Sequence, residues 1–273
     1  DKAEEMYNKA LEIERELGRK EGIASAYGQL GIVFQIRGNL KEAEEMQKKA
    51  LAMNMELNRK KGIANAYGNL GNIYLSRDNS EEAKKMQKKA LAISINLGWK
   101  EGMASNYGNL GSVYQTRGDL DKAEEMYNKA LEIDIELGRK EGMATAYGNL
   151  GGIYKKRGDL KKAEEMQKKS LAINKEVGNK EGIAGAYLNL GIIYEAAGDL
   201  GKAKEMYEKA LDISIESGIK EIMAHSYGNL GIIYKTTGNS KDAQEMWIKS
   251  IDLFKKIGNK KMVDKLQMLM DSL

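Results

Sequence analysis

Three absences narrow what this chain can be. The 273 residues contain no cysteine, no proline and a single histidine. Without cysteine the chain forms no disulfide and has no thiolate chemistry, and it suits a reducing compartment, so we expect a cytoplasmic protein. Without proline, long helices can run uninterrupted, because an interior proline costs about 3 kcal/mol. A lone histidine makes no metal site, and no serine or acid pair recurs in catalytic spacing. We therefore expect no metal, no cofactor and no enzymatic activity.

Long apolar runs and a strong charge imbalance are also missing. No stretch approaches the roughly 20 apolar residues that a membrane span needs. The 44 basic and 40 acidic residues leave a net charge of +4. Both signs are interspersed, and this balance is too mild to predict binding to nucleic acid or to a membrane. The chain begins with Asp1 rather than methionine, so we expect it to be a segment of a longer protein.

What the chain does contain is one pattern that returns every 40 residues. One copy is the stretch YGNLGNIY at residues 67–74, and near-copies occupy 27–34, 107–114, 147–154, 187–194 and 227–234. A helix turns by about 100° per residue, so Tyr67, Leu70 and Tyr74 share one face. The opposite side carries a strip of polar residues, namely Asn65, Asn69, Asn72 and Ser76. One face is therefore suited to packing and the other to contacts with solvent or a ligand.

The pattern predicts two alternating kinds of helix. Those that carry the repeated stretch, named A helices here, are expected at 20–37, 60–77, 100–117, 140–157, 180–197 and 220–237. The others, named B helices, are expected at 1–17, 40–57, 80–97, 120–137, 160–177, 200–217 and 240–257. Residues 259–273 are expected to form a last helix, with an apolar stripe of Met262, Leu266, Leu269 and Leu273.

These helices predict an all-α fold of stacked pairs. An orphan B helix at 1–17 is followed by six A–B repeats and an extra C-terminal helix at 259–273. The repeats span 18–58, 59–98, 99–138, 139–178, 179–218 and 219–258. Because a fixed period means that each unit packs on its neighbours, we expect a single solenoid over 1–273.

Turn residues support these boundaries. A residue that favours or tolerates positive φ follows each helix, and it is glycine everywhere except at Asn58 and Asp78. In each turn from an A helix to a B helix, this residue is followed by an asparagine or an aspartate, which is a good N-cap for the B helix. These predicted caps are Asn39, Asn79, Asp119, Asp159, Asp199 and Asn239.

The spacing Tyr67-x2-Leu70-Gly71-x2-Tyr74, followed by Ala83 and Ala90, resembles the tetratricopeptide repeat. Two departures are the period of 40 instead of 34 and the missing proline near the end of the second helix. The longer unit is similar to repeats of the Pins/LGN group. The resemblance implies a right-handed superhelix whose A helices line a concave groove that holds an extended or partly helical segment of another protein.

The polar strip falls where that resemblance places groove-lining residues. We expect peptide contacts from Gln29, Asn65, Asn69, Asn72, Asn109, Asn149, Lys155, Lys156, Asn189, His225, Asn229 and Lys235. An amide has two donor hydrogens and an acceptor, so it can hold a peptide unit of an extended chain. In the alternative interpretation, each asparagine bonds within its own helix or bridges neighbouring A helices.

Five glycines lie in the A helices beside the polar strip, at positions called the groove shoulder here, and their presence has two explanations. Gly28, Gly68, Gly108, Gly148 and Gly228 lie mid-helix, where glycine costs roughly 0.5–1 kcal/mol relative to alanine. Close approach of a neighbouring helix is the favoured reason, and close approach of a ligand backbone is the alternative.

The favoured function is an adaptor that binds an extended peptide segment of a partner protein, and we expect acidic side chains in that segment. The acidic character is expected from Lys155, Lys156 and Lys235. Other hypotheses stay open: a structural array that self-associates through its end helices, an engineered consensus-like scaffold, and recognition of single-stranded RNA.

Overall fold

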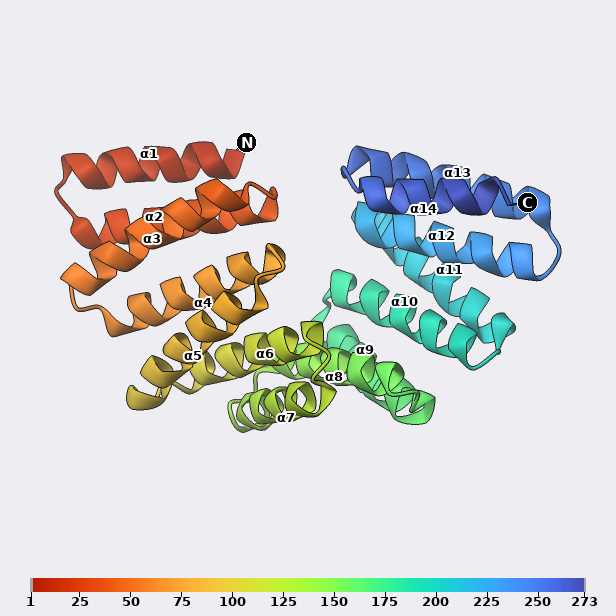
Figure 1. The fold of residues 1–273 in the computed structure, drawn as a ribbon, viewed down its shortest axis with the longest axis horizontal. Helices are drawn as coiled ribbons and strands as arrows, with labels where there is room; N and C mark the ends of the chain where they lie inside the picture. The colour runs from red at the N-terminus through yellow and green to blue at the C-terminus, as the bar shows by residue number, and fades with distance from the viewer. Residues whose placement is uncertain (1, 273) are drawn as a thin grey trace. The chain divides into compact units, whose positions relative to one another are not determined.

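The computed structural model describes residues 2–272, which form fourteen helices and no strand (Figure 1). The A helices are α2 (Lys20–Ile36), α4 (Lys60–Ser76), α6 (Lys100–Thr116), α8 (Lys140–Lys156), α10 (Lys180–Ala196) and α12 (Lys220–Thr236). The B helices are α1 (Lys2–Glu16), α3 (Leu40–Glu56), α5 (Ser80–Asn96), α7 (Leu120–Glu136), α9 (Leu160–Val177), α11 (Leu200–Ser217) and α13 (Ser240–Lys256), and α14 (Lys260–Met270) follows. The predicted all-α class and the alternation of A and B helices are confirmed.

Helix ends differ little from the prediction. The last helix is the main correction, because it spans Lys260–Met270 instead of 259–273. Of its predicted apolar stripe, Leu266 is buried and Met262 and Leu269 are half-buried. Leu273 lies outside the described residues.

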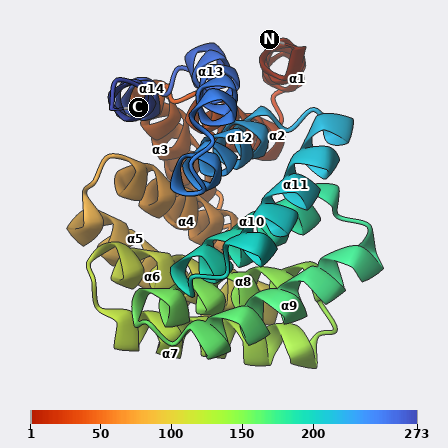
Figure 2. The ribbon, with the colours of Figure 1, turned by 90° about the vertical axis from the view of Figure 1, so that its right-hand side faces the viewer.

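The chain divides into two compact units, Asp1–Gly138 and Arg139–Leu273. The first contains the hairpins α2–α3, α4–α5 and α6–α7, preceded by α1. The second contains the hairpins α8–α9, α10–α11 and α12–α13, followed by α14, which packs against α13 (Figure 2). The single array over 1–273 stays a prediction.

The turns form as their residues predict. Asn58 (φ 51°) and Asp78 (φ 57°) take the left-handed conformation that glycine takes at the equivalent sites. The side chains of Asn79, Asp119, Asp159, Asp199 and Asn239 accept a hydrogen bond from the backbone three residues later, as expected for N-caps. The predicted cap is wrong only at Asn39, whose side chain makes no such bond.

Every hairpin is closed by a large B-helix side chain packed against an A-helix glycine. Tyr127 is 1% exposed, and a Cβ placed on Gly111 would lie 2.5 Å from its ring. The equivalent glycine and side-chain pairs are Gly31–Gln47, Gly71–Gln87, Gly151–Gln167, Gly191–Tyr207 and Gly231–Trp247. In four hairpins the B-helix side chain also donates a hydrogen bond to a second glycine, which lies three residues before the one it packs against. For example, Gln47 packs against Gly31 and its Nε2 donates to Gly28 O at 2.8 Å.

Charged side chains connect the two helices of a hairpin across its surface. In α6–α7, the Lys129 ammonium lies 5.7 Å from the centroid of the Tyr107 ring. The same cation–π pair recurs as Tyr27–Lys49, Tyr67–Lys89, Tyr147–Lys169, Tyr187–Lys209 and Tyr227–Lys249. At the open end of the hairpin, Lys100 pairs with Glu136, as do Lys20 with Glu56, Lys140 with Glu176 and Lys180 with Glu216. Exposed pairs of this kind stabilise only weakly.

Gly111 and Gly108 of α6 offer a matched test of the packing. We expect Gly111→Ala to destabilise the protein by about 1–3 kcal/mol, because the new methyl group overpacks the buried Tyr127 ring. Gly108→Ala should stabilise it by about 0.5–1 kcal/mol, because its Cβ would meet no atom within 4 Å. Thermal unfolding followed by circular dichroism measures both. A Gly111→Ala midpoint at or above the wild-type midpoint contradicts the packing argument.

Candidate functional site

Two recesses lie side by side along the A helices of the first unit. The first has a volume of about 360 Å³ and lies between α2 and α4, with α3 beneath. It is lined by Ser25, Gly28, Gln29, Ile32, Gln47, Asn54, Arg59, Lys61, Gly62, Asn65 and Asn69, with Ala24, Ala50 and Ala66. The second, of about 260 Å³, lies between α4 and α6. Asn65 and Asn69 line both recesses, so the two form one polar surface.

Three of the predicted amides on this surface keep their hydrogen-bonding capacity. Gln29 and Asn65 are exposed and Asn69 is half-buried. Within residues 2–272, their side chains make no hydrogen bond to the rest of the protein. Each amide offers two donor hydrogens and one acceptor. These groups are therefore available to a ligand.

The other two predicted amides of the first unit are used inside the protein. Asn72 accepts a hydrogen bond from Gln87 Nε2 at 2.9 Å, and Asn109 Nδ2 donates to Gln87 Oε1 at 3.5 Å. Asn69 follows Gln47 by 22 residues, as Asn109 follows Gln87, but the corresponding bond is absent. Gln47 Oε1 consequently stays buried without a partner beside Asn69.

Two buried residues of this site were not predicted. Gln47 is 1% exposed and Asn54 is 5% exposed, both line the first recess, and each has a buried side-chain oxygen without a partner. Unsatisfied buried oxygens are uncommon, because each costs about 1–3 kcal/mol. A sequence signal existed: Gln47 interrupts the apolar stripe of α3 between Ala43 and Ala50.

The surroundings of the groove-shoulder glycines show where a neighbouring helix requires a glycine and where it does not. A Cβ at Gly28 or Gly108 would meet no atom within 4 Å, so a neighbouring helix does not require glycine there. At Gly68 and Gly148 the nearest atoms would lie at ordinary contact distances of 3.5 and 3.6 Å, and only Gly228 is tight, at 3.2 Å from Ser250 Oγ. The favoured explanation was therefore wrong at Gly28 and Gly108.

In the second unit the predicted residues are spread over α8, α10 and α12. Asn149 and Asn229 are half-buried and Asn189 is exposed, and their side chains make no hydrogen bond within residues 2–272. Lys155 and Lys156 end α8, with no ion pair in the described part of the chain. Lys235, in contrast, donates to Ser272 Oγ at 2.8 Å, beyond the end of α14.

His225 is a packing residue in this structure. Its ring meets Phe254, which is fully buried, edge to face at 5.0 Å between centroids. Burial lowers the pKa of His225, and Lys265 on α14 acts in the same direction, while Glu221 opposes both.

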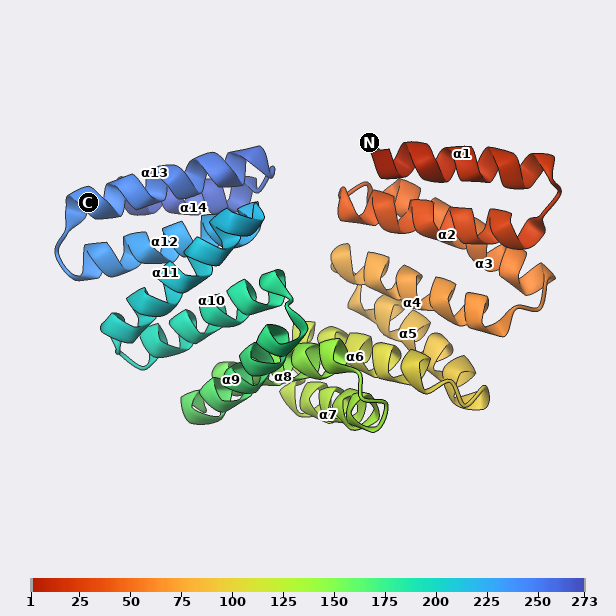
Figure 3. The same cartoon turned by 180° about the vertical axis from the view of Figure 1, so that it is seen from behind.

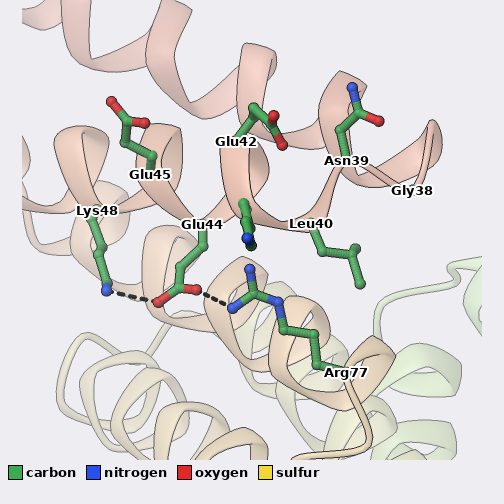
Figure 4. Close-up of a pocket in the computed structure, with 9 residues that line it drawn as sticks. Gly38, Asn39, Leu40, Glu42, Glu44, Glu45, Lys48 and Arg77 are labelled. Carbon is green, nitrogen blue, oxygen red and sulfur yellow. Dashed lines mark hydrogen bonds and ion pairs between the residues drawn. The ribbon is translucent and has the colours of Figure 1, made fainter.

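A further recess in the first unit, of about 710 Å³, is formed by the α2–α3 turn, α3 and Arg77 (Figure 4). Glu44 is the centre of its charge network and accepts hydrogen bonds from Lys48 at 2.7 Å, from Tyr74 at 3.0 Å and from Arg77. The Lys48 ammonium contributes most to the lowered pKa of Glu44, against the effect of burial. This charge network joins α3 to α4 across the recess.

Comparison with protein families gives a clear match. The sequence matches the family described as tetratricopeptide repeat over residues 1–56, 62–136, 102–176, 142–216 and 182–256. A comparison with curated protein sequences finds no significant match. Within residues 2–272, no helix is both long and apolar enough to cross a membrane.

Solved structures show the same fold. BtubC from P. vanneervenii has a TM-score of 0.67 at 24% identity, covering 80% of this chain and 91% of that one. A signal transduction ATPase from Pyrococcus horikoshii, with a tetratricopeptide repeat sensor, has a TM-score of 0.70 at 20% identity and covers 97% of this chain and 42% of its own. A Rap protein complexed with competence and sporulation factor has a TM-score of 0.67 at 16% identity, with coverages of 93% and 74%. At these identities the likeness concerns the fold alone.

The burial of His225 predicts a pH dependence of stability. Its folded pKa is lowered, so the folded protein binds fewer protons there than the unfolded chain, whose pKa is about 6.5. The neutral ring's contribution is present above that value and is lost as the pH falls through it. We expect the thermal unfolding midpoint to be lower at about pH 5.5 than at about pH 7.5. His225→Gln should make this dependence of the midpoint on pH weaker. Equal slopes for the two proteins count against the assignment.

Proposed function

This chain belongs to the tetratricopeptide repeat family, whose members generally bind other proteins and are generally non-catalytic. On that premise we propose that it is an interaction scaffold that holds an extended peptide segment of a partner protein. The segment would lie across α2, α4 and α6, on the polar surface made by the two recesses. We also propose that the repeats are of the 40-residue type that resembles the Pins/LGN group, and that the protein is cytoplasmic.

The observation that carries this proposal is the set of unused amides. Gln29, Asn65 and Asn69 line the recesses without a hydrogen-bond partner in the described part of the chain. An extended peptide presents unpaired N–H and C=O groups, which an amide side chain matches with its donors and acceptor. Gly28 and Gly108, which have free space where a Cβ would be, would let a peptide backbone approach the helices closely.

The amides of successive A helices lie on one surface, as binding of an extended chain requires. Gln29 and Asn69 stand at the same position of successive A helices, and both line the first recess. An extended chain advances about 3.3 Å per residue. Amides on successive A helices would therefore meet different residues of one bound peptide.

Hydrogen bonds alone would give weak binding. Each adds about 0.5–1.5 kcal/mol net, whereas association costs about 4–15 kcal/mol. A partner that binds tightly must also fill the recesses with side chains. Ile32 in the first recess and Trp99 in the second are the large apolar side chains against which they would pack.

Binding of a peptide at the two recesses is tested with a variant that combines Gln29→Ala, Asn65→Ala and Asn69→Ala. A displayed library of linear 12-residue peptides is selected on the wild-type chain, and the enriched peptides are measured by fluorescence anisotropy. Loss of three hydrogen-bonding groups should weaken their binding at least tenfold, since about 1.4 kcal/mol corresponds to a factor of ten.

Asn96→Ala is the matched control, because Asn96 is an exposed amide that ends α5, outside the two recesses. Its affinity for the selected peptides should equal that of the wild type. If the triple variant also binds them as the wild type does, the recesses are not the binding site and the proposal is wrong.

The preference for acidic segments rests on Lys155 and Lys156. We propose that these unpaired cations at the end of α8, in the second unit, attract carboxylates of the partner protein. Reversing both charges, with Lys155→Glu and Lys156→Glu, should weaken binding of acidic library peptides severalfold at low salt, with little effect on neutral ones. Titrations at low and high salt measure this, and an unchanged affinity for acidic peptides would rule it out.

A further inference from the structure

The arrangement that leaves amides free at the first recess occurs a second time in this chain. Residues 43–49 of α3 and 163–169 of α9 are identical, and both stretches contain the buried glutamine of the B helix. Figure 3 shows α3 beside α2 and α4, and α9 beside α8 and α10. One group of three helices lies wholly in the first unit and the other wholly in the second. The other B helices of the second unit, α11 and α13, have a tyrosine or a tryptophan in place of this glutamine.

The buried glutamine is held in the same way in both groups. Gln47 is 1% exposed and Gln167 is 2% exposed. Nε2 of Gln47 donates to Gly28 O, and Nε2 of Gln167 donates to Gly148 O, each at 2.8 Å. Both Oε1 atoms are buried without a partner in the part of the chain that the structure describes. An unpartnered buried acceptor is unfavourable, so both groups keep the same unfavourable feature.

The neighbouring helix α5 shows how a repeat removes this feature. Gln87 Oε1 accepts from Asn109 Nδ2 at 3.5 Å, which uses the amide that follows the glutamine by 22 residues. At the same separation, the glutamine of α3 is followed by Asn69 and that of α9 by Asn189. Within residues 2–272 neither of these side chains makes a hydrogen bond. At both positions the amide is therefore left free for another molecule.

Each group contains a second free amide. Gln29 of α2 and Asn149 of α8 stand at the same position of the repeat, and neither side chain has a hydrogen-bond partner among the described residues. Where α4 has Asn65, α10 has Gly185, and a Cβ placed on Gly185 would meet no atom within 4 Å. Because Gly185 lies one helical turn before the exposed Asn189, a peptide backbone can approach α10 closely there.

We propose that α8, α9 and α10 form a second peptide-binding site, equivalent to the one in α2, α3 and α4. Asn149 and Asn189 hold an extended segment there by its backbone N–H and C=O groups, as Gln29 and Asn69 do at the first site. One chain then holds two such segments at once. This inference rests on the proposed function and extends it to the second unit.

The two sites differ at their edges. Arg59 and Lys61 line the first recess, and the equivalent residues of the second unit are Asn179 and Glu181. Amide contacts to a peptide backbone do not depend on the peptide sequence, whereas charge at the edge of a site selects among side chains. The two sites therefore bind segments of the same kind that need not share a sequence.

Two variants isolate the sites. The combined Gln29, Asn65 and Asn69 alanine variant keeps only the second site, and a variant that combines Asn149→Ala and Asn189→Ala keeps only the first. A displayed library of linear 12-residue peptides is selected on each variant, and both selections should enrich peptides. The protein with all five substitutions should bind each set at least tenfold more weakly, measured by fluorescence anisotropy.

Gln244→Ala is the matched control in the second unit, because Gln244 is an exposed amide on α13. Added to the triple alanine variant, it should leave the affinity for the selected peptides unchanged. Native mass spectrometry of the wild-type chain, saturated with one peptide from each selection, should show two peptides bound per chain.

The possible failures are distinguishable. Enrichment of peptides on the wild type but not on the triple alanine variant would overturn the second site and leave the proposed function intact. One bound peptide per chain would do the same, as would peptides selected on the triple variant whose binding is unchanged by Asn149→Ala and Asn189→Ala. Failure to enrich any peptide on the wild type would contradict the proposed function and this inference with it.

Discussion

The contact between an A-helix glycine and a large buried B-helix side chain determines the rest of this structure. Without a Cβ at Gly31 or Gly111, the A helix approaches close enough for Gln47 or Tyr127 to fill the space between the two axes. Gln47 then reaches the carbonyl oxygen of Gly28. Because Gly28 belongs to the groove shoulder, the contact that closes the hairpin also fixes the rotation of the A helix. That rotation also determines which residues of the polar strip reach a B helix, as Asn72 does, and which stay exposed, as Asn65 does.

How each amide is used within the first unit decides where a ligand can bind. Gln87 takes up Asn72 and Asn109 as partners, so α5 fixes polar groups of both α4 and α6. Gln47 binds only the Gly28 carbonyl and leaves Asn69 free. The repeats are similar in sequence, but their amides differ in availability. Selectivity along the surface can therefore arise without any change in the backbone.

The helices and turns could be predicted because their causes are local. Positive φ at Asn58 and Asp78 follows from the residues themselves, and periodicity shows which side of α4 packs. Whether Asn69 or Asn109 has a free amide could not be predicted, because it depends on a glutamine 22 residues earlier and on its side-chain conformation. The open space at Gly28 is likewise a property of the surrounding helices.

The role of His225 is a second feature that the sequence alone did not predict. By sequence it occupies the position of Asn65 on the polar strip, yet its ring packs on Phe254, where the hairpin that contains Asn65 has Ser94. Phenylalanine at that position makes an apolar neighbour for whatever residue lies above it. The role of a strip residue is thus determined by the B helix beneath it as much as by its own chemistry.

The two copies of the sequence DKAEEMYNKALEI separate what a local sequence determines from what its neighbours determine. Both copies form helices, in α1 and in α7, because the amphipathic pattern and one packed side suffice. Their burial differs because α6 covers one copy and no described helix covers the other. The hydrophobic free energy of Met6 and Ile13 is unrealised in α1 and largely realised in α7. A repeat sequence therefore specifies which face binds a helix, and only the neighbouring helix turns that specification into stability.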